Sequence, residues 1–76
     1  MLSEEDRAIL DFERASWRDA GPKDLSIEMD LGLQSRVYYE RLRSLVNSPA
    51  GSSYDPLTAK RVRRLIEKIA EAELAV

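Results

Sequence analysis

The chain has 76 residues, of which 43% are hydrophobic and 34% charged, with a net charge of −2 and no cysteine or histidine. That length allows one small domain over residues 1–76, and the missing residue types exclude disulfides, thiol redox chemistry, zinc-finger sites and a histidine general base. No apolar run approaches the roughly 18–20 residues of a membrane span, and the acidic N-terminus is unlike a signal peptide, so we expect a cytoplasmic protein.

The first predicted helix covers about residues 4–20, with Ser3 as its N-cap and three acidic side chains in its first turn, where the helix dipole favours anions. One broad face of this helix is expected to be buried, and it carries Ile9, Leu10, Phe12, Ser16, Trp17 and Ala20. Glu13 falls on the same face. Because a buried carboxylate needs a partner, we expect an ion pair with an arginine of a later helix, such as Arg41 or Arg64.

The next segment has the pattern of a helix-turn-helix: a short helix over 23–31, a tight turn at Leu31-Gly32-Leu33 and a second helix over 34–46. Gly32 is the expected pivot, because a sharp turn after a helix often needs a positive φ that only glycine adopts without steric cost. An ordinary helical corner remains the alternative. The apolar residues of 23–31 nearly alternate, so a strand competes there, but the charged residues between them make an isolated strand implausible.

The helix over 34–46 divides into two sides. Its buried side is predicted from residues at helical spacing: Tyr38, Leu42, Leu45 and Val46. Six residues on the other side or at the helix start are predicted to contact DNA: Gln34, Ser35, Arg36, Tyr39, Glu40 and Arg43. Arginines can pair bidentately with guanine edges or phosphates, and a glutamate can accept from cytosine. A solvated face joined by Arg36–Glu40 and Glu40–Arg43 pairs explains the same residues, and both interpretations stay open.

Residues 47–54 are rich in turn formers and are the one long loop that the sequence predicts. Asp55 as N-cap and Pro56 at the first helical position begin a helix over 56–74. Its predicted apolar side consists of Leu57, Val62, Leu65, Ile66 and Ile69. The opposite arc carries five bases, one of which is Lys68. The other four either contact phosphates or form a solvated face: Lys60, Arg61, Arg63 and Arg64. The tail 69–76 extends the pattern beyond a small core, so we expect a homodimer contact through this helix, or fraying.

The charges are distributed unevenly along the chain. Residues 1–30 carry nine acidic and four basic side chains, whereas residues 31–76 carry eight basic and five acidic ones. Within 36–64, seven bases stand against only Glu40 and Asp55. The field near a surface depends on such local asymmetry more than on the total charge, so the later part of the chain is the part expected to face a polyanion.

Several strings, taken in order, carry a family resemblance: Ala8-Ile9-Leu10-Asp11-Phe12-Glu13-Arg14, then Trp17, Gly21, Lys23, Ile27, Gly32, Tyr38-Tyr39, Leu42, Leu45, Asp55-Pro56-Leu57 and Lys60-Arg61-Val62-Arg63-Arg64-Leu65. They resemble a family of small actinobacterial proteins, also carried by their phages, that is catalogued as a domain of unknown function and looks like a helix-turn-helix. The resemblance covers about residues 8–65 and implies a fold but no activity. The chain departs from the family at Ser16, at Val37 and after Lys68, where the C-terminal helix turns acidic.

These observations predict a compact all-α domain of three or four helices containing a helix-turn-helix, with no cofactor and no metal. The leading function is binding of double-stranded DNA by a transcription-associated or phage regulatory factor, with helix 34–46 reading the groove and helix 56–68 contacting phosphates. The alternative is a protein-interaction module, such as a phage-encoded modulator of a host protein, that uses the outer face of 34–46 and the C-terminal tail. An enzyme is not expected, because no serine, threonine or lysine has a visible base partner.

Overall fold

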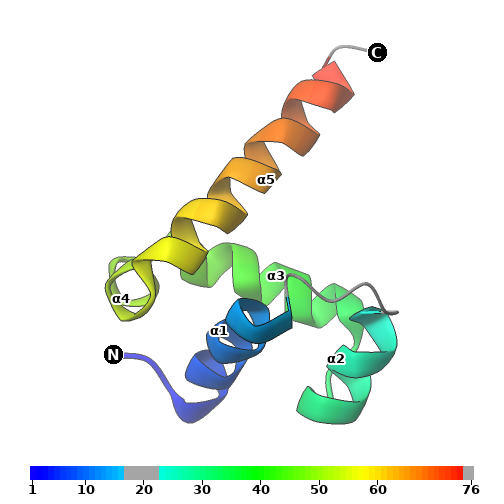
Figure 1. Cartoon of the computed structure of the whole chain (residues 1–76), viewed down its shortest axis with the longest axis vertical. Helices are drawn as coiled ribbons and strands as arrows, with labels where there is room; N and C mark the ends of the chain where they lie inside the picture. The colour runs from blue at the N-terminus through cyan, green and yellow to red at the C-terminus, as the bar shows by residue number, and fades with distance from the viewer. Residues whose placement is uncertain (17–22, 75–76) are drawn as a thin grey trace.

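The computed structural model describes residues 1–16 and 23–74, and these residues form five α-helices and no strand. The helices are α1 (Glu4–Ser16), α2 (Lys23–Leu31), α3 (Ser35–Val46), α4 (Pro49–Tyr54) and α5 (Pro56–Leu74). Helix α3 lies in the middle and contacts each of the other four, whereas α5 starts beside α4 and extends away from the body (Figure 1). The predicted all-α class is confirmed. None of the described helices combines the length and apolar character that crossing a membrane requires.

The start of α1 follows its sequence signals. The Ser3 hydroxyl accepts a hydrogen bond from the Asp6 N–H at 3.1 Å, and the Asp6 carboxylate accepts one from the Ser3 N–H at 3.1 Å. This reciprocal pair satisfies two N–H groups that the helix itself cannot. Ile9 and Leu10 are fully buried and Glu13 is 3% exposed, which confirms the predicted inner face for the described part of the helix.

The core is built from the inward faces of α1, α2, α3 and α5. Its buried hydrophobic residues are Ile9, Leu10, Ile27, Tyr38, Leu42, Leu45, Val46, Ala59 and Val62. Tyr38 is fully buried, as predicted, and its ring lies edge-on to that of Phe12 with centroids 5.6 Å apart. Burying one large apolar side chain stabilises a fold by about 1.5–3 kcal/mol. Trp17 and Ala20, which were also predicted to face inward, lie outside the described residues.

The prediction of a loop over 47–54 is wrong, because Pro49–Tyr54 form α4. The Ser48 hydroxyl caps this helix by accepting a hydrogen bond from the Gly51 N–H at 3.0 Å. A Cβ on Gly51 would lie 2.0 Å from the Leu45 carbonyl oxygen, so glycine lets α4 press against the end of α3. Serine, proline and glycine are turn formers, but serine and proline also start helices, and packing against α3 decided between the two roles.

Helix α5 begins as predicted, because the Asp55 carboxylate accepts a hydrogen bond from the Thr58 N–H at 3.2 Å. Its predicted apolar side is only partly buried: Leu57 is 81% exposed, and Leu65 and Ile69 are each 53% exposed. The residues that α5 buries are Thr58, Ala59 and Val62. Only the first turns of α5 lie against the other helices, and the rest extends past them (Figure 1). Periodicity shows which side of a helix is apolar but not where its neighbours end.

Candidate nucleic-acid interface

A glycine turn joins α2 to α3. Gly32 has a φ of 66°, as predicted, and its N–H donates a hydrogen bond to the Glu28 carbonyl oxygen at 2.9 Å. A Cβ at Gly32 would meet no atom within 4 Å, so the backbone conformation and not the available space favours glycine here. Gln34 is the N-cap of α3, with extended backbone and no side-chain hydrogen bond to the helix. The sequence placed the start of α3 at 34, and the structure places it at Ser35.

The predicted reading residues of α3 are mostly on the surface. Gln34, Arg36, Glu40 and Arg43 are exposed, Tyr39 is 43% exposed, and Ser35 is half-buried. The Arg36 Nε lies 3.3 Å from a Glu40 carboxylate oxygen, so one of the two predicted surface pairs forms. Within residues 1–16 and 23–74, the second predicted pair, between Glu40 and Arg43, does not form. Tyr39 packs edge-on to Tyr38, and the Lys23 ammonium lies 5.5 Å from the Tyr39 ring centroid.

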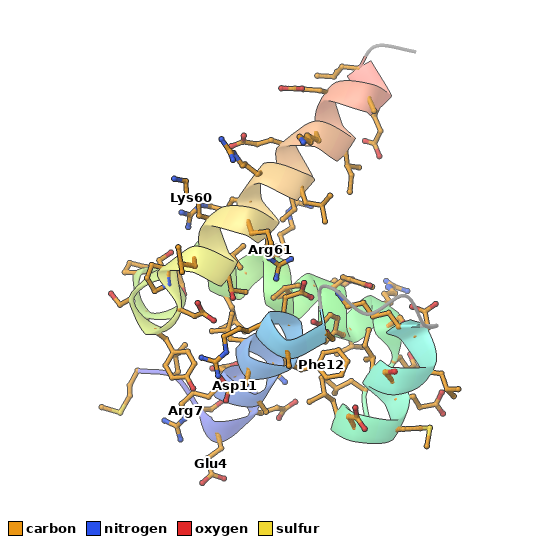
Figure 2. The ribbon with its side chains drawn as sticks, viewed as in Figure 1. Glu4, Arg7, Asp11, Phe12, Lys60 and Arg61 are labelled. Carbon is orange, nitrogen blue, oxygen red and sulfur yellow. The ribbon has the colours of Figure 1, made fainter. Side chains whose placement is uncertain are left out.

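The four bases of α5 do not share one outer arc, which corrects the prediction for Arg61 and Arg63. Arg61 donates to a Glu13 carboxylate oxygen at 3.1 Å and to the Glu13 carbonyl at 3.3 Å. Arg63 donates to the Val46 carbonyl oxygen at 2.7 Å and thereby binds the C-terminal end of α3, where the helix dipole favours a cation. Figure 2 shows Lys60 pointing away from the body, while Arg61 points toward α1.

Lys60 and Arg64 remain as the exposed members of this set. Within the described part of the chain, neither side chain makes a hydrogen bond or an ion pair. Lys68 is also exposed and follows Arg64 by four residues, so these cations form a stripe along the outer side of α5. The stripe is the part of α5 that is available to a polyanion.

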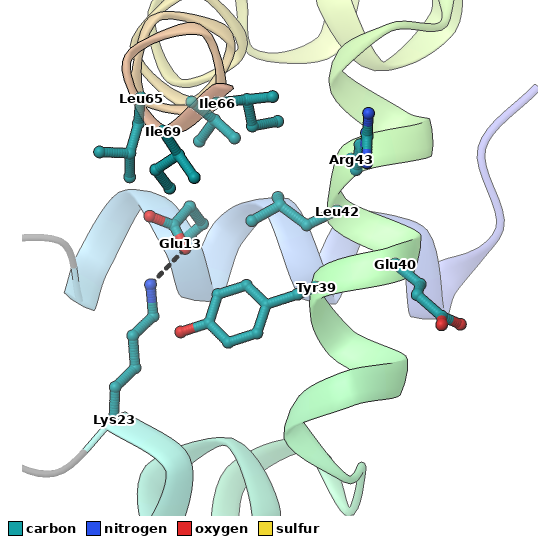
Figure 3. A pocket seen from close by; sticks show the side chains of 10 residues that line it. Glu13, Lys23, Tyr39, Glu40, Leu42, Arg43, Leu65, Ile66 and Ile69 are labelled. Atoms are coloured by element: carbon teal, nitrogen blue, oxygen red, sulfur yellow. Dashed lines mark hydrogen bonds and ion pairs between the residues drawn. The ribbon is translucent and has the colours of Figure 1, made fainter. Parts of the chain in front are cut away.

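Glu13 is the centre of a buried polar cluster that joins four helices. Its carboxylate accepts hydrogen bonds from the Lys23 ammonium at 2.6 Å and the Tyr38 hydroxyl at 2.7 Å, besides the one from Arg61 (Figure 3 shows the bond to Lys23). Burial alone would raise the pKa of the Glu13 carboxyl, but hydrogen bonds from Lys23, Tyr38 and Arg61 outweigh it and hold the pKa below its ordinary value. Burial beside this carboxylate raises the pKa of Tyr38.

The predicted arginine partner of Glu13 from a later helix is confirmed by Arg61, but the two examples that the sequence suggested, Arg41 and Arg64, do not bind it. Arg41 binds Glu5 and Asp6 on α1, with 2.9 Å to the Asp6 carboxylate, and Arg64 is on the outer side of α5. Lys23 and Tyr38 were missed as partners. Helical phase identified Glu13 as inward-facing, but no spacing rule relates it to residues ten or more positions away.

A family model described as Protein of unknown function (DUF3263) matches residues 1–72. The chain belongs to the DUF3263 family. The match covers α1 to α4 and most of α5, so the Gly32 turn, the Glu13 cluster and the exposed stripe of α5 all lie within the DUF3263 region. No curated protein and no solved structure matches the chain.

This DUF3263 domain also has a hollow of about 380 Å³ between α3 and α5. Its apolar wall consists of Leu42, Val62, Leu65, Ile66 and Ile69 (Figure 3). Its polar edge consists of Glu13, Lys23, Tyr39, Glu40 and Arg43. Residues 1–16 and 23–74 contain no group of three or more acidic, histidine or cysteine side chains that could bind a metal. Because its wall is apolar and its edge is polar, the hollow suits an apolar side chain or helix with a polar end.

Proposed function

We propose that this protein binds double-stranded DNA through a helix-turn-helix formed by α2, the Gly32 turn and α3. The observation that carries the proposal is the first turn of α3, which follows the glycine turn closely, has no side-chain cap and exposes Arg36 and Val37. Uncapped N–H groups at a helix start, together with the helix dipole, favour a phosphate. Arg36, two residues after the cap, is 86% exposed at its side chain.

The other proposed DNA contacts follow from placing the start of α3 against the DNA. A major groove admits an α-helix, and residues near the start of α3 would reach base edges first. Arg36 and Tyr39 supply donors, and Glu40 can accept from cytosine once its pair with Arg36 opens. Lys60 and Arg64 supply phosphate contacts, because they are exposed and carry no partner within residues 1–16 and 23–74. A role as a transcription-associated or phage regulatory factor is part of this proposal.

The second candidate is a protein-interaction module, and the surface of α2 favours it. Leu25 and Met29 lie one turn apart on α2 and are both exposed. The acidic side chains on the same helix are Asp24, Glu28 and Asp30. An exposed apolar pair among acids repels phosphates and suits a partner protein with basic and apolar side chains.

Fluorescence anisotropy with labelled random and genomic duplexes at 50 to 200 mM salt tests the proposal. We expect binding that weakens steeply with salt, and Arg36→Ala should lower the affinity for the preferred sequence by about 1–3 kcal/mol. Arg14→Ala is the matched control, because Arg14 is an exposed arginine on α1, far from the proposed interface in the sequence. If the protein binds no duplex near 50 mM salt, the proposal of DNA binding is wrong and the protein-interaction module replaces it.

A further inference from the structure

The hollow between α3 and α5 continues onto an apolar side of α5 that the described helices leave half-exposed. Leu65 and Ile69 are one turn apart, line the hollow and are each 53% exposed. Glu73 follows Ile69 by four residues and so lies on the same side. Leu74 is 87% exposed but lies on the opposite side of the helix from Leu65, because nine residues separate them. The apolar contact is therefore confined to one stripe that ends in an acid.

The charges of α5 run against its own helix dipole. Its first half carries the four bases at 60–64, its second half carries three acids and one base, Lys68, and there is no acid in its first turn and no base in its last. A single helix is stabilised by the reverse order. Base-before-acid spacing along one helix is also the weaker orientation for side-chain pairs. An antiparallel second α5 would bring the acidic end of each helix toward the basic half of the other, where Arg61 and Arg63 are already bound within the chain and Lys60 and Arg64 have no partner among residues 1–16 and 23–74.

Arg43 provides the specific counter-charge at the hollow. It lies in the last turn of α3, near where α4 and α5 begin, and it is exposed on the edge of the hollow. Its side chain has no ion pair among the described residues. A second α5 that runs antiparallel to the first would bring its C-terminal end, with Glu73, toward this end of the hollow.

We propose that two copies of the chain pair antiparallel through α5, each α5 lying in the hollow of the other copy. Leu65 and Ile69 form the apolar contact, and Glu73 of one copy meets Arg43 of the other. The contact is isologous, so both hollows are filled by the same interaction and the assembly closes as a dimer. The proposal does not rest on DNA binding, and its test contains no DNA. Tyr39 and Glu40 line the hollow, so the dimer would cover part of the α3 surface proposed for DNA.

Sedimentation equilibrium of the full chain over a wide concentration range measures the pairing. We expect the wild type to reach the mass of a dimer and Ile69→Asp to remain a monomer, with helical content and Tm showing that the variant is folded. Leu74→Asp is the matched control: it places the same charge at an exposed apolar residue on the opposite side of α5, and it should stay dimeric. A wild type that is monomeric throughout, or a control that dissociates as readily as Ile69→Asp, would overturn the proposal.

Charge exchange tests the antiparallel arrangement. Glu73→Arg and Arg43→Glu should each weaken dimerisation by about 3–10-fold, and the double variant should regain most of the loss, since both like-charge contacts become opposite-charge contacts again. A dimer that neither single variant weakens, or that the double variant fails to restore, would refute the arrangement. If the chain is monomeric and its hollow binds a small molecule or another protein, the hollow is a binding site for that ligand and the proposal of a dimer is overturned.

Discussion

Two pairs of basic residues in one helical turn of α5 behave in opposite ways. Arg61 and Arg63 lie on either side of the buried Val62 and bind Glu13 and the end of α3, whereas Lys60 and Arg64 face solvent. Their long apolar stems allow arginines beside a core to turn inward while keeping their charge partnered. A run of bases is therefore not a uniform phosphate-binding surface. Half of this run holds the fold together, and half is available to a ligand.

The largest expected effect comes from removing Glu13, the buried acid that binds Arg61 and Lys23. Glu13→Gln should lower the free energy of unfolding by about 1–3 kcal/mol, because Lys23 and Arg61 lose their charge partner in a largely buried site. Urea denaturation measures the change. Glu40→Gln, at an exposed acid whose partner is also exposed, should change it by less than about 0.5 kcal/mol. Equal effects of the two variants would mean that Glu13 is solvated.

The same contact should depend on pH. The pKa of Glu13 in the folded chain lies below its ordinary value of 4.5, so its contribution is complete above that value and is lost as pH falls through the folded-state pKa. The difference in unfolding free energy between wild type and Glu13→Gln should therefore be constant near neutral pH and shrink in acid. Urea denaturation of both proteins at pH 7 and at about pH 3 checks this. A difference that grows on acidification would contradict it.

A smaller effect is expected where Arg63 binds the end of α3. Arg63→Ala should lower the free energy of unfolding by about 1–2 kcal/mol, because the Val46 carbonyl and the Ser52 hydroxyl both lose its hydrogen bonds. Arg64→Ala, one residue further along, should stay within about 0.5 kcal/mol of wild type. Thermal and urea unfolding of this adjacent pair compares the inward and outward positions directly. If Arg63→Ala and Arg64→Ala have identical stabilities, the hydrogen bonds of Arg63 do not stabilise the fold.

The smallest effect on stability and the clearest effect on the salt dependence of DNA binding are expected at Lys60 and Arg64, the two bases that face solvent. Lys60→Ala and Arg64→Ala should each reduce the slope of log affinity against log salt by about 1, with no loss of stability. Arg63→Ala should leave that slope unchanged, since its guanidinium is committed to Val46 and Ser52. Anisotropy titrations at several salt concentrations measure the slopes. An equal loss at Arg63 and Arg64 would show that the inward arginine also reaches phosphates.

Short-range features of this protein could be predicted from the sequence because they depend on residues within one turn of each other. The caps at Ser3 and Asp55 are of this kind, since serine and aspartate each accept from an N–H three residues away. Gly32 is another, because its positive φ follows from the end of α2. Helical phase likewise identified Tyr38 as a core residue and Glu13 as inward-facing.

Long-range features were decided only by the tertiary structure. Phase shows that Glu13 faces inward but not that Lys23 and Tyr38 are the groups it meets there. The short α4 needed contact with α3 and α5, because so few residues form a helix poorly alone. The exposure of Leu65 depends on where the other helices end. The sequence determined α1, α2, α3 and α5 and the inner faces of α1 and α3 through local steric and hydrogen-bonding rules. The formation of α4 and the partners of each inner face depend on how separate helices pack in space.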